Sequence, residues 1–163
     1  MPYCMNCGQI MEERVPPGDD RTRLVCPACG WIAYANPKVV VGALPVVAGK
    51  VLLLRRGIEP GHGKWTYPGG FLEMDESAEE GARREAREEL GIEVDGLRLL
   101  GVYSRPSAGI VTVVYLAEVT AGEPRPSAEA LEGRFFAADE IPWDDLAFPT
   151  TVSALRDWVS TTR

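Results

Sequence analysis

The sequence is short of positive charge and has no long hydrophobic run. It contains 17 Lys and Arg against 24 Asp and Glu, a net charge of −7. A general binder of nucleic acid or anionic membranes relies on basic side chains, so this balance argues against both. The most apolar stretch, residues 39–48, is interrupted by Gly42 and Pro45 and is too short to span a bilayer. The N-terminus lacks the basic start and apolar centre of a signal peptide. We therefore expect a cytoplasmic protein without a membrane or nucleic-acid partner.

Cysteine is absent beyond residue 29. Two Cys-x-x-Cys pairs, separated by 18 residues, consist of Cys4, Cys7, Cys26 and Cys29. This spacing is typical of a four-cysteine zinc ribbon. Two disulfides are the alternative, which a cytosolic location disfavours. We predict a structural Zn²⁺ site in a small domain of residues 1–36, followed by a larger domain of residues 37–163.

The predicted ribbon has no basic surface. Its charged side chains sum to −1, because four carboxylates face three arginines. Four thiolates around Zn²⁺ would add about −2 more, a balance that argues against DNA recognition. The metal instead replaces a core too small to fold alone. We expect the ribbon to cap the larger domain or to form a dimer contact.

Residues 37–163 alternate between β-rich runs and two helical patterns. Gly49-Lys50 predicts a hairpin turn between the first two strands. The predicted strands are residues 39–47, 51–55, 65–68, 98–103, 110–120 and 134–136. A closing helix is predicted over residues 151–161, with inward side chains from Val152, Leu155, Trp158 and Val159. This order fits an α/β fold, a mixed sheet with a helix on either side.

The first helix carries an apolar stripe and a cluster of carboxylates. Ser77 and Glu80 form a capping box that should start it, and Gly91 should end it. The stripe, expected to pack on the sheet, consists of Ala78, Ala82, Ala86 and Leu90. Beside it lie three glutamates at i, i+3 and i+4: Glu85, Glu88 and Glu89. Their mutual repulsion predicts a cation among them.

Two sources of positive charge fit this cluster. The carboxylates can pair with Arg83, Arg84 and Arg87 on a solvated helix face, Arg84 and Glu88 being an ordinary i, i+4 pair. They can also bind Mg²⁺ or Mn²⁺, which take carboxylate oxygens as ligands. The spacing of the surrounding residues favours the metal.

Residues 70–92 resemble the signature box of the Nudix hydrolases. This 23-residue stretch begins at Gly70, reaches Glu76 after five residues and, seven residues later, reads Arg-Glu-Ala-Arg-Glu-Glu-Leu-Gly-Ile from Arg84 to Ile92. The resemblance implies the α/β/α Nudix sandwich and a metal-dependent hydrolase. Many relatives have glycine where this chain has Asp75, and we expect only a small adjustment of the loop there.

The same resemblance implies roles by position. The implied divalent-metal ligands are the Gly69 carbonyl and the carboxylates of Glu85, Glu88 and Glu89. Arg84 matches the arginine that orients Glu85, and Glu76 matches the glutamate that ties the loop to the helix. Glu85 or a loop carboxylate is the expected general base. Further candidates for a ligand or base, which are otherwise exposed loop acids, are Glu129 and Glu132.

Nearly the whole chain resembles zinc-ribbon Nudix hydrolases, which include NADH pyrophosphatases and FAD or ADP-ribose pyrophosphatases. The residues that carry this are the four cysteines, the box, Tyr34-x-Asn36-Pro37-Lys38 and Gly63-x-Trp65-x-x-Pro68-Gly69-Gly70. NADH pyrophosphatases have a Ser-Gln-Pro-Trp-Pro-Phe-Pro array after the box, where residues 101–107 of this chain read Gly-Val-Tyr-Ser-Arg-Pro-Ser. The resemblance therefore favours FAD or ADP-ribose over NADH, with AMP and a phosphorylated remainder as products.

A dinucleotide or nucleotide-sugar substrate needs aromatic surfaces for its rings and cations for its phosphates. The main candidate contacts are Arg55, Trp65, Phe71, Tyr103 and Arg105. Others near the expected cleft are Arg56, Lys64, Tyr67 and Phe148. Each aromatic ring can instead belong to the core, and each cation can serve solubility. His62, the only histidine, is expected on a surface loop.

Two other functions are compatible with the box. One is a nucleotide-pool or RNA-end hydrolase that uses the same site on another substrate. The other is a ligand-sensing Nudix regulator that has lost catalysis, against which the complete acidic set argues. In either case we expect a homodimer.

Overall fold

The computed structural model describes residues 2–161, which divide into two compact units between Asn36 and Pro37. The smaller unit is an antiparallel sheet of β1 (Glu12–Arg14), β2 (Arg23–Val25) and β3 (Ile32–Ala33), in that order. Two cysteine turns flank it, each closed by a 2.9 Å hydrogen bond from the amide of Gly8 or Gly30. These glycines have φ of 76° and 75°, a backbone conformation that strains other residues.

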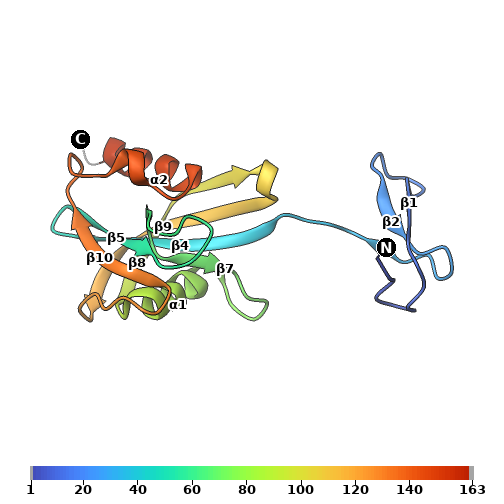
Figure 1. The fold of residues 1–163 in the computed structure, drawn as a ribbon, viewed down its shortest axis with the longest axis horizontal. Coiled ribbons are helices and arrows are strands. Elements are labelled where there is room, and N and C mark those ends of the chain that lie inside the picture. Colours follow the sequence, from blue (N-terminus) through green and yellow to red (C-terminus); the bar gives the residue numbers. More distant parts are fainter. Residues whose placement is uncertain (1, 162–163) are drawn as a thin grey trace. The chain divides into compact units, whose positions relative to one another are not determined.

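The larger unit is built on one mixed sheet with the strand order β10-β5-β4-β9-β8 (Figure 1). Among the paired strands in residues 2–161, β4 and β9 alone run parallel to each other. The strands are β4 (Lys38–Val47), β5 (Lys50–Arg56), β8 (Glu93–Arg105), β9 (Ile110–Ala121) and β10 (Ala130–Phe136). Two short strands extend the sheet, β6 (Trp65–Thr66) beside β5 and β7 (Gly69–Phe71) beside β4.

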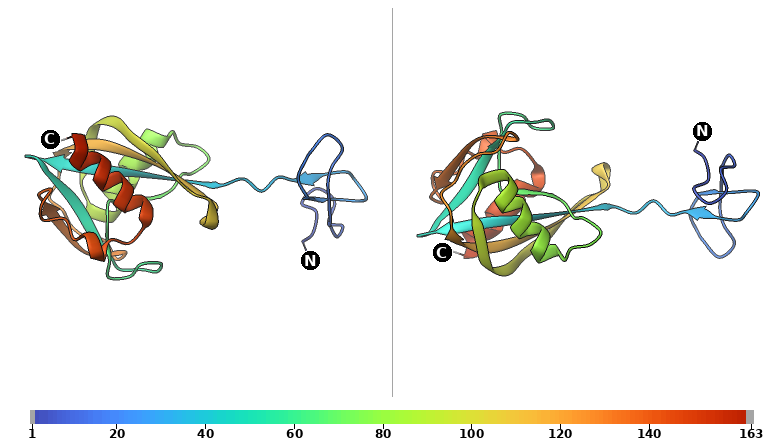
Figure 2. Two further views of the ribbon diagram at one scale, coloured as in Figure 1. Left: turned by 90° about the horizontal axis from the view of Figure 1, so that it is seen from above. Right: turned by 90° about the horizontal axis from the view of Figure 1, so that it is seen from below.

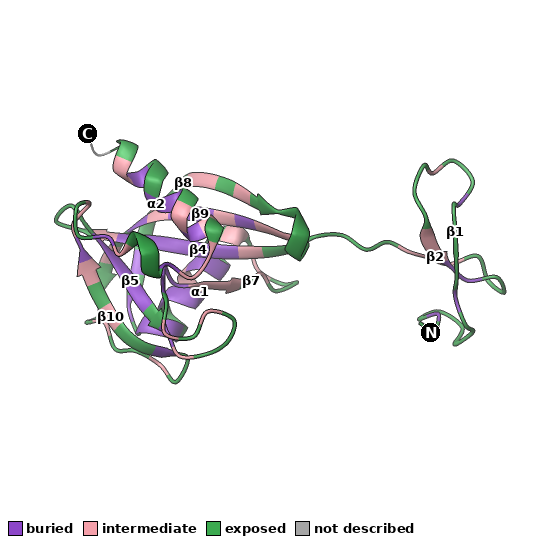
Figure 3. Cartoon of the chain, turned by 45° about the horizontal axis from the view of Figure 1, so that its top comes forward, coloured by how far each residue is buried: buried purple, intermediate pink, exposed green. Residues whose placement is uncertain are grey.

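The two long helices cover opposite faces of this sheet. Figure 2 shows α2 (Pro149–Thr161) in front of the sheet in one view and α1 (Ala78–Leu90) in front of it in the other. Single 3₁₀ turns are η1 (Pro106–Ala108) and η2 (Trp143–Asp145). Strand side chains alternate between the faces, so Leu52 and Leu54 pack with α1 while Val51 and Leu53 pack with α2. Figure 3 shows the buried residues concentrated where the sheet meets the helices. The predicted α/β sandwich is thereby confirmed.

Several predicted bounds need correction. The last strand runs from Ala130 rather than residue 134, and the strand that starts at Trp65 ends at Thr66 rather than residue 68. The strand after α1 starts at Glu93, not Arg98, because it pairs with nearly all of β9 through three irregularities in register. All four residues of α2 predicted to point inward pack on the core, Leu155 and Trp158 fully buried and Val152 and Val159 partly buried, and the buried face also includes Thr151 and Ala154. An apolar pattern does not predict the burial of Thr151, because threonine is polar. Its hydroxyl can be buried because it forms a 2.9 Å hydrogen bond with the Thr66 hydroxyl.

No helix within residues 2–161 has the length and apolar character needed to cross a membrane.

Candidate active site and metal centres

Helix α1 holds the acidic residues in a fixed orientation. The Ser77 hydroxyl accepts from the Glu80 amide at 3.2 Å, and the Glu80 carboxylate accepts from the Ser77 amide at 2.7 Å, which completes the predicted capping box. Gly91 ends the helix with a left-handed φ of 66°. The buried stripe of the helix consists of Ala82, Ala86 and Leu90. Packing of that stripe on the sheet directs Glu85 and Glu89 along the edge of the buried face.

Both of these glutamates reach the two glycines that precede and open the box. Glu89 Oε2 accepts a hydrogen bond from the Gly69 amide at 2.8 Å. The Glu85 carboxylate lies so close to Gly70 that a Cβ at that position would overlap it. A Cβ at Gly69 would lie 2.6 Å from the carbonyl oxygen of Val41 in β4. Gly69 therefore has no room for a side chain, whereas a side chain at Gly70 would displace the Glu85 carboxylate.

Burial makes the charged forms of the two glutamates costly. Glu85 and Glu89 are 9% and 7% exposed. Burial raises the pKa of both carboxyl groups, that of Glu89 to about 7, even though the Gly69 amide opposes the shift. Their mutual repulsion, together with Glu129, raises the pKa of Glu89 further. A cation at this edge would stabilise the ionised pair.

Arg84 supplies positive charge on one side of the cluster. Its guanidinium donates to Glu76 at 2.9 and 2.6 Å, to Glu85 Oε1 at 2.7 Å and to Glu88 Oε2 at 3.1 Å. A further 3.2 Å bond reaches the Phe71 carbonyl. The paired guanidinium lowers the pKa of Glu76 to about 2. Arg84 thus ties the loop before α1 to the acidic face of the helix.

The other two arginines of α1 do not pair with the glutamate cluster. Arg83 binds Asp95 at 3.0 Å, and Arg87 binds Glu93 at 2.6 Å. Both partners lie at the start of β8. Of the three arginines, Arg84 is therefore the one that pairs with the glutamate cluster. Its single guanidinium is shared by the carboxylates of Glu76, Glu85 and Glu88.

The remaining oxygen donors fit a divalent cation. Within residues 2–161, no hydrogen bond reaches Glu85 Oε2 or Glu89 Oε1. Glu88, with a 58% exposed side chain, offers its carboxylate from the solvent side. Mg²⁺ and Mn²⁺ take oxygen ligands of this kind and retain several waters. Glu85, Glu89 and Glu88, with the Gly69 carbonyl, are the residues that would hold such an ion.

The four cysteine sulfurs form a second cluster, in the smaller unit. All four Sγ atoms lie within 4.8 Å of one another, and the thiols are free. The Cys4–Cys29 and Cys7–Cys26 sulfurs are 3.7 and 3.4 Å apart, too far for disulfides. Four Zn–S bonds of about 2.3 Å place tetrahedral sulfurs about 3.8 Å apart. The cluster therefore fits the predicted structural zinc site.

Hydrogen-bond donors favour the thiolate form of Cys29. The Trp31 amide and the Asn6 side chain lower its pKa to about 6. The Gln9 amide likewise lowers the pKa of Cys7, but hydrogen bonds with the neighbouring thiols and burial raise it to about 12. The Asn6 amide also donates to Cys4 Sγ at 3.4 Å. Thiolate is the form that binds zinc.

A cleft of about 210 Å³ opens beside Gly69 and Gly70. Its lining includes the cations Arg56 and Arg105 and the aromatic rings of Phe71 and Phe148. Phe71 is 51% exposed and has Lys38 Nζ 5.1 Å from its ring centroid. The cleft thus combines exposed aromatic surface with positive charge next to the acidic edge of α1.

Arg56, rather than Arg55, faces the cleft. Its guanidinium lies 5.1 Å from the Phe148 ring centroid, and its Nε donates to the Pro60 carbonyl at 2.8 Å. Its charge also acts on Glu89. Arg55 instead donates to the Gly63 carbonyl at 2.7 Å and does not line the cleft. The alternation Leu52, Leu54, Arg56 along β5 is the sequence signal that distinguishes the two arginines.

Two predicted substrate contacts belong to the packing instead. Trp65 is 7% exposed and packs edge-on against Phe136, with ring centroids 4.9 Å apart. Tyr103 donates to Asp157 of α2 at 2.8 Å. Neither lines the cleft, whereas Phe71 and Arg105 do. Both rings pack on the core beneath α2, Trp65 as a buried member and Tyr103 as a partly buried neighbour.

The two later glutamates are placed differently. Glu129 is exposed but close enough to act on the Glu89 carboxyl group. Glu132 is exposed on β10 opposite Arg55, and within residues 2–161 no bond connects it to the acidic cluster. His62 lies exposed in the loop between β5 and β6. Of these three, Glu129 alone is associated with the site.

Comparison with known families agrees with this geometry. Residues 36–159 match the Nudix domain, and residues 2–35 match the zinc-ribbon family described as Nudix N-terminal. The chain belongs to the Nudix hydrolase family. The recognition made from the box and the cysteines is confirmed, as is the expectation of an enzyme.

Individual relatives extend this result. The chain is 34% identical to an ADP-ribose pyrophosphatase of Methanocaldococcus jannaschii over 113 residues, 67% of each protein. It is 32% identical to the NAD-capped RNA hydrolase NudC of Pseudomonas aeruginosa, covering 86% of this chain and 49% of that one. The chain therefore spans about half the length of that relative. A crystal structure of a Nudix hydrolase from Nitrosomonas europaea superposes with a TM-score of 0.89 at 42% identity, covering 96% of this chain and 89% of that one.

Proposed function

We propose that this Nudix hydrolase is a divalent-metal-dependent pyrophosphohydrolase acting on a nucleoside diphosphate linked to a second group. FAD and ADP-ribose are the favoured substrates, ahead of NADH. Hydrolysis between the two phosphorus atoms gives AMP and a phosphorylated remainder. The ADP-ribose pyrophosphatase among its relatives supports this class of substrate.

One observation carries the proposal. Two buried carboxylates, Glu85 and Glu89, converge on Gly69 and Gly70 at the mouth of a cleft that contains Arg56 and Arg105. A diphosphate needs both features, since acidic side chains hold the activating cation and guanidinium groups neutralise phosphate oxygens. A solvated surface helix would need neither.

Each residue of the proposed active site has a distinct role in hydrolysis. Glu85, Glu88 and Glu89 would hold a divalent ion, which would polarise the phosphoryl group and acidify a water molecule. Glu85 accepts the proton from the attacking water where its free oxygen does not hold the ion, and otherwise the loop carboxylate of Glu129, which acts on the neighbouring Glu89, is the base. Arg84 holds Glu85 and Glu76 in position. Arg56 and Arg105 bind the diphosphate, and Phe71 and Phe148 offer ring surfaces.

A substrate panel tests the proposal. The purified full chain is incubated with FAD, ADP-ribose, NADH, diadenosine polyphosphates and oxidised dGTP, with added Mg²⁺ or Mn²⁺, and the products are identified. AMP released from FAD or ADP-ribose supports the proposed activity. No hydrolysis of any pyrophosphate would instead support the inactive ligand-sensing regulator.

An RNA 5′ end is the second candidate substrate, because the chain matches an NAD-capped RNA hydrolase over 86% of its length. NAD-capped RNA added to the same panel separates the candidates. A kcat/KM for capped RNA above those for FAD and ADP-ribose would assign the activity to RNA ends.

A further inference from the structure

The cleft of the proposed active site contains a buried hydroxyl that the proposed mechanism does not use. Four of the polar side chains that line the cleft are buried: Arg56, Thr66, Tyr67 and Thr112. The first three are hydrogen-bonded within the chain, Thr66 to Thr151 at 2.9 Å and Tyr67 to Thr150. Thr112 is 3% exposed, and its hydroxyl has no hydrogen-bond partner among residues 2–161. Of these four side chains, Thr112 is the one left free to bond a ligand.

The hydroxyl of Thr112 opens into the cleft. Within residues 2–161, every fully enclosed side-chain oxygen or nitrogen has a hydrogen-bond partner. Because Thr112 Oγ1 has none, it must reach accessible surface, and Thr112 lines the cleft. Its neighbours on the same face of β9 are the apolar residues Ile110 and Val114. Packing alone would therefore favour valine here, since a buried hydroxyl without a partner is less stable than an apolar group of similar shape.

Thr112 lies in one row with an exposed aromatic ring. Val40 in β4 pairs with Thr112 in β9 on one side and with Phe71 in β7 on the other. Neighbouring strands are about 4.8 Å apart, so a single strand separates the hydroxyl from the strand that carries the ring. Gly69 pairs with Gly42, two residues along β4 from Val40. The row is therefore about 7 Å from the segment to which the acidic edge of α1 is bonded.

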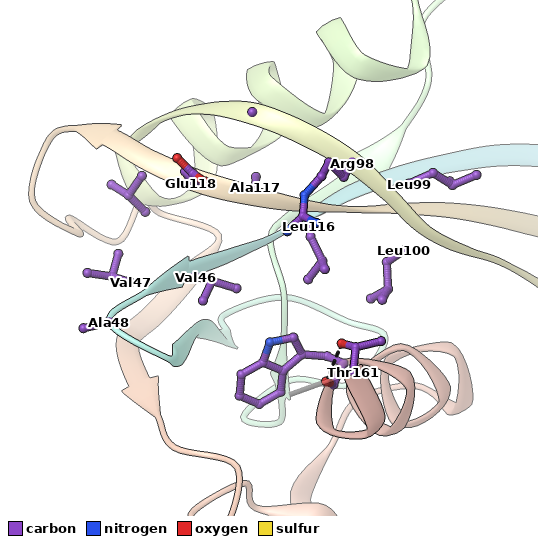
Figure 4. Close-up of a pocket in the computed structure, with 13 residues that line it drawn as sticks. Val46, Val47, Ala48, Arg98, Leu99, Leu100, Leu116, Ala117, Glu118 and Thr161 are labelled. Carbon is purple, nitrogen blue, oxygen red and sulfur yellow. Dashed lines mark hydrogen bonds between the residues drawn. The ribbon is translucent and has the colours of Figure 1, made fainter. Parts of the chain in front are cut away.

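The other hollow of the larger unit offers no comparable group. It has a volume of about 680 Å³ and lies between the C-terminal end of α2 and the strands β4, β8 and β9. Its charged or hydroxyl side chains, Arg98, Glu118 and Thr161, are all exposed (Figure 4). The buried residues that line it are Ala117 and Trp158, and Trp158 already has a partner. Among residues 2–161, the buried and uncommitted hydroxyl is thus a feature of the cleft and not of both hollows.

We propose that Thr112 determines specificity by forming a hydrogen bond with the edge of the nucleobase of the substrate. A neutral hydroxyl is both donor and acceptor, which suits the carbonyl, amino and ring-nitrogen groups of a base. Phosphate oxygens are instead matched by guanidinium groups. Val40, Ile110 and Phe71 line the same cleft and supply apolar surface for a flat ring. This inference rests on the proposed function for its class of ligand.

The position of the row agrees with such a ligand. A nucleotide with its phosphate beside Gly69 and its base at Thr112 has its sugar in the space between them. A base that bonds the hydroxyl compensates for its burial, whereas a ligand without a base leaves it unpaired. Thr112 should therefore contribute to the binding of AMP but not to that of ribose 5-phosphate, which has the phosphate and sugar without the base.

Isothermal titration calorimetry of the full chain with AMP and with ribose 5-phosphate, in the presence of Mg²⁺, tests the proposal. AMP should bind more tightly than ribose 5-phosphate. Thr112→Val should raise the Kd of AMP about tenfold and leave that of ribose 5-phosphate unchanged. Thr112→Ser retains the hydroxyl and should keep the Kd of AMP within about threefold of its original value.

Thr120→Val is the matched control, because it makes the same chemical change at an exposed position of the same strand, where the hydroxyl donates to the Glu93 carbonyl at 3.3 Å. It should leave both dissociation constants unchanged. Thermal unfolding of the ligand-free chain adds a second measurement. The midpoint of Thr112→Val should equal or exceed the original, because the unpaired hydroxyl is replaced by a methyl group.

Several outcomes would overturn the role of Thr112. They are an original chain that binds AMP no more tightly than ribose 5-phosphate, a Thr112→Val chain with undiminished AMP affinity or with equal losses for both ligands, and a lower unfolding midpoint in Thr112→Val, which would indicate a structural hydroxyl. Hydrolysis of ADP-ribose by the same samples separates this inference from the proposed function. AMP binding that depends on Thr112 without any hydrolysis would support the base contact and contradict the proposed activity.

Discussion

The amide of Gly69 donates a 2.8 Å hydrogen bond to Glu89 Oε2, which connects β7, the strand in which the Nudix box begins, to the last turn of α1. This hydrogen bond holds the buried Glu89 carboxylate against the backbone of residues 69 and 70, which have no side chains that could take its place. Gly70 brings Glu85 to the same segment. The acidic edge of α1 is therefore defined as much by two glycines as by its glutamates.

Gly70→Ala should reduce activity more than stability. The added Cβ would overlap the end of the Glu85 side chain, which can move aside and so loses its position in the site. We expect kcat/KM to fall about 100-fold, with the unfolding midpoint lowered by less than about 4 °C. Hydrolysis rates and thermal unfolding of the same samples check both values.

Gly69→Ala is the contrasting variant. Its Cβ would lie 2.6 Å from the Val41 carbonyl oxygen and 2.9 Å from the Gly42 Cα, and backbone in the middle of a sheet cannot yield. Its free energy of unfolding should fall by about 2–3 kcal/mol. Equal stability losses in the two glycine variants would contradict this explanation.

Glu85→Gln and Glu88→Gln should each suppress turnover at least 100-fold or so while the fold is retained, because each removes a charged oxygen donor from the metal site. Steady-state kinetics over a range of Mg²⁺ concentrations, with circular dichroism, measure this. Glu123→Gln, an exposed loop position, is the control and should be silent. Near-normal rates in both site variants would remove these residues from the proposed catalytic set.

Arg56→Lys should raise KM for ADP-ribose about tenfold with a smaller change in kcat. Lysine keeps the charge but loses the bond from Nε to Pro60 and the planar contact with Phe148. Arg55→Lys is a matched control on the next residue, since Arg55 lies outside the cleft. If the two variants behave alike, the assignment of Arg56 to the diphosphate is wrong.

Cys4→Ser should release the zinc of the ribbon and destabilise it, because Cys4 is a buried member of the four-sulfur cluster. Metal analysis of the purified chain should show about one zinc per chain before the change and little after it. Met5→Leu, at an exposed neighbouring position, should retain the metal. Full zinc content in Cys4→Ser would argue against a four-thiolate site.

The sequence by itself determined the local features. The capping box at Ser77, the stop at Gly91 and the apolar stripe of α1 follow from propensities and spacing over a few residues, and the structure has them. The two Cys-x-x-Cys turns are equally local, and their sulfurs meet as expected. Local spacing also predicted the order of strands and helices, although the length of β8 depended on its pairing with β9.

Only the tertiary structure decided which side chains reach the cleft. Arg55 and Arg56 are neighbours of the same type, and the face of β5 on which each lies separates them. Trp65 and Tyr103 were predicted to contact the rings of the substrate. In the structure Trp65 packs against Phe136, and Tyr103 is hydrogen-bonded to α2. Arg84 could pair with any nearby acid, and the path of the preceding loop brought Glu76 to it. These outcomes depend on contacts between residues far apart in the chain, which residue type and spacing alone do not specify.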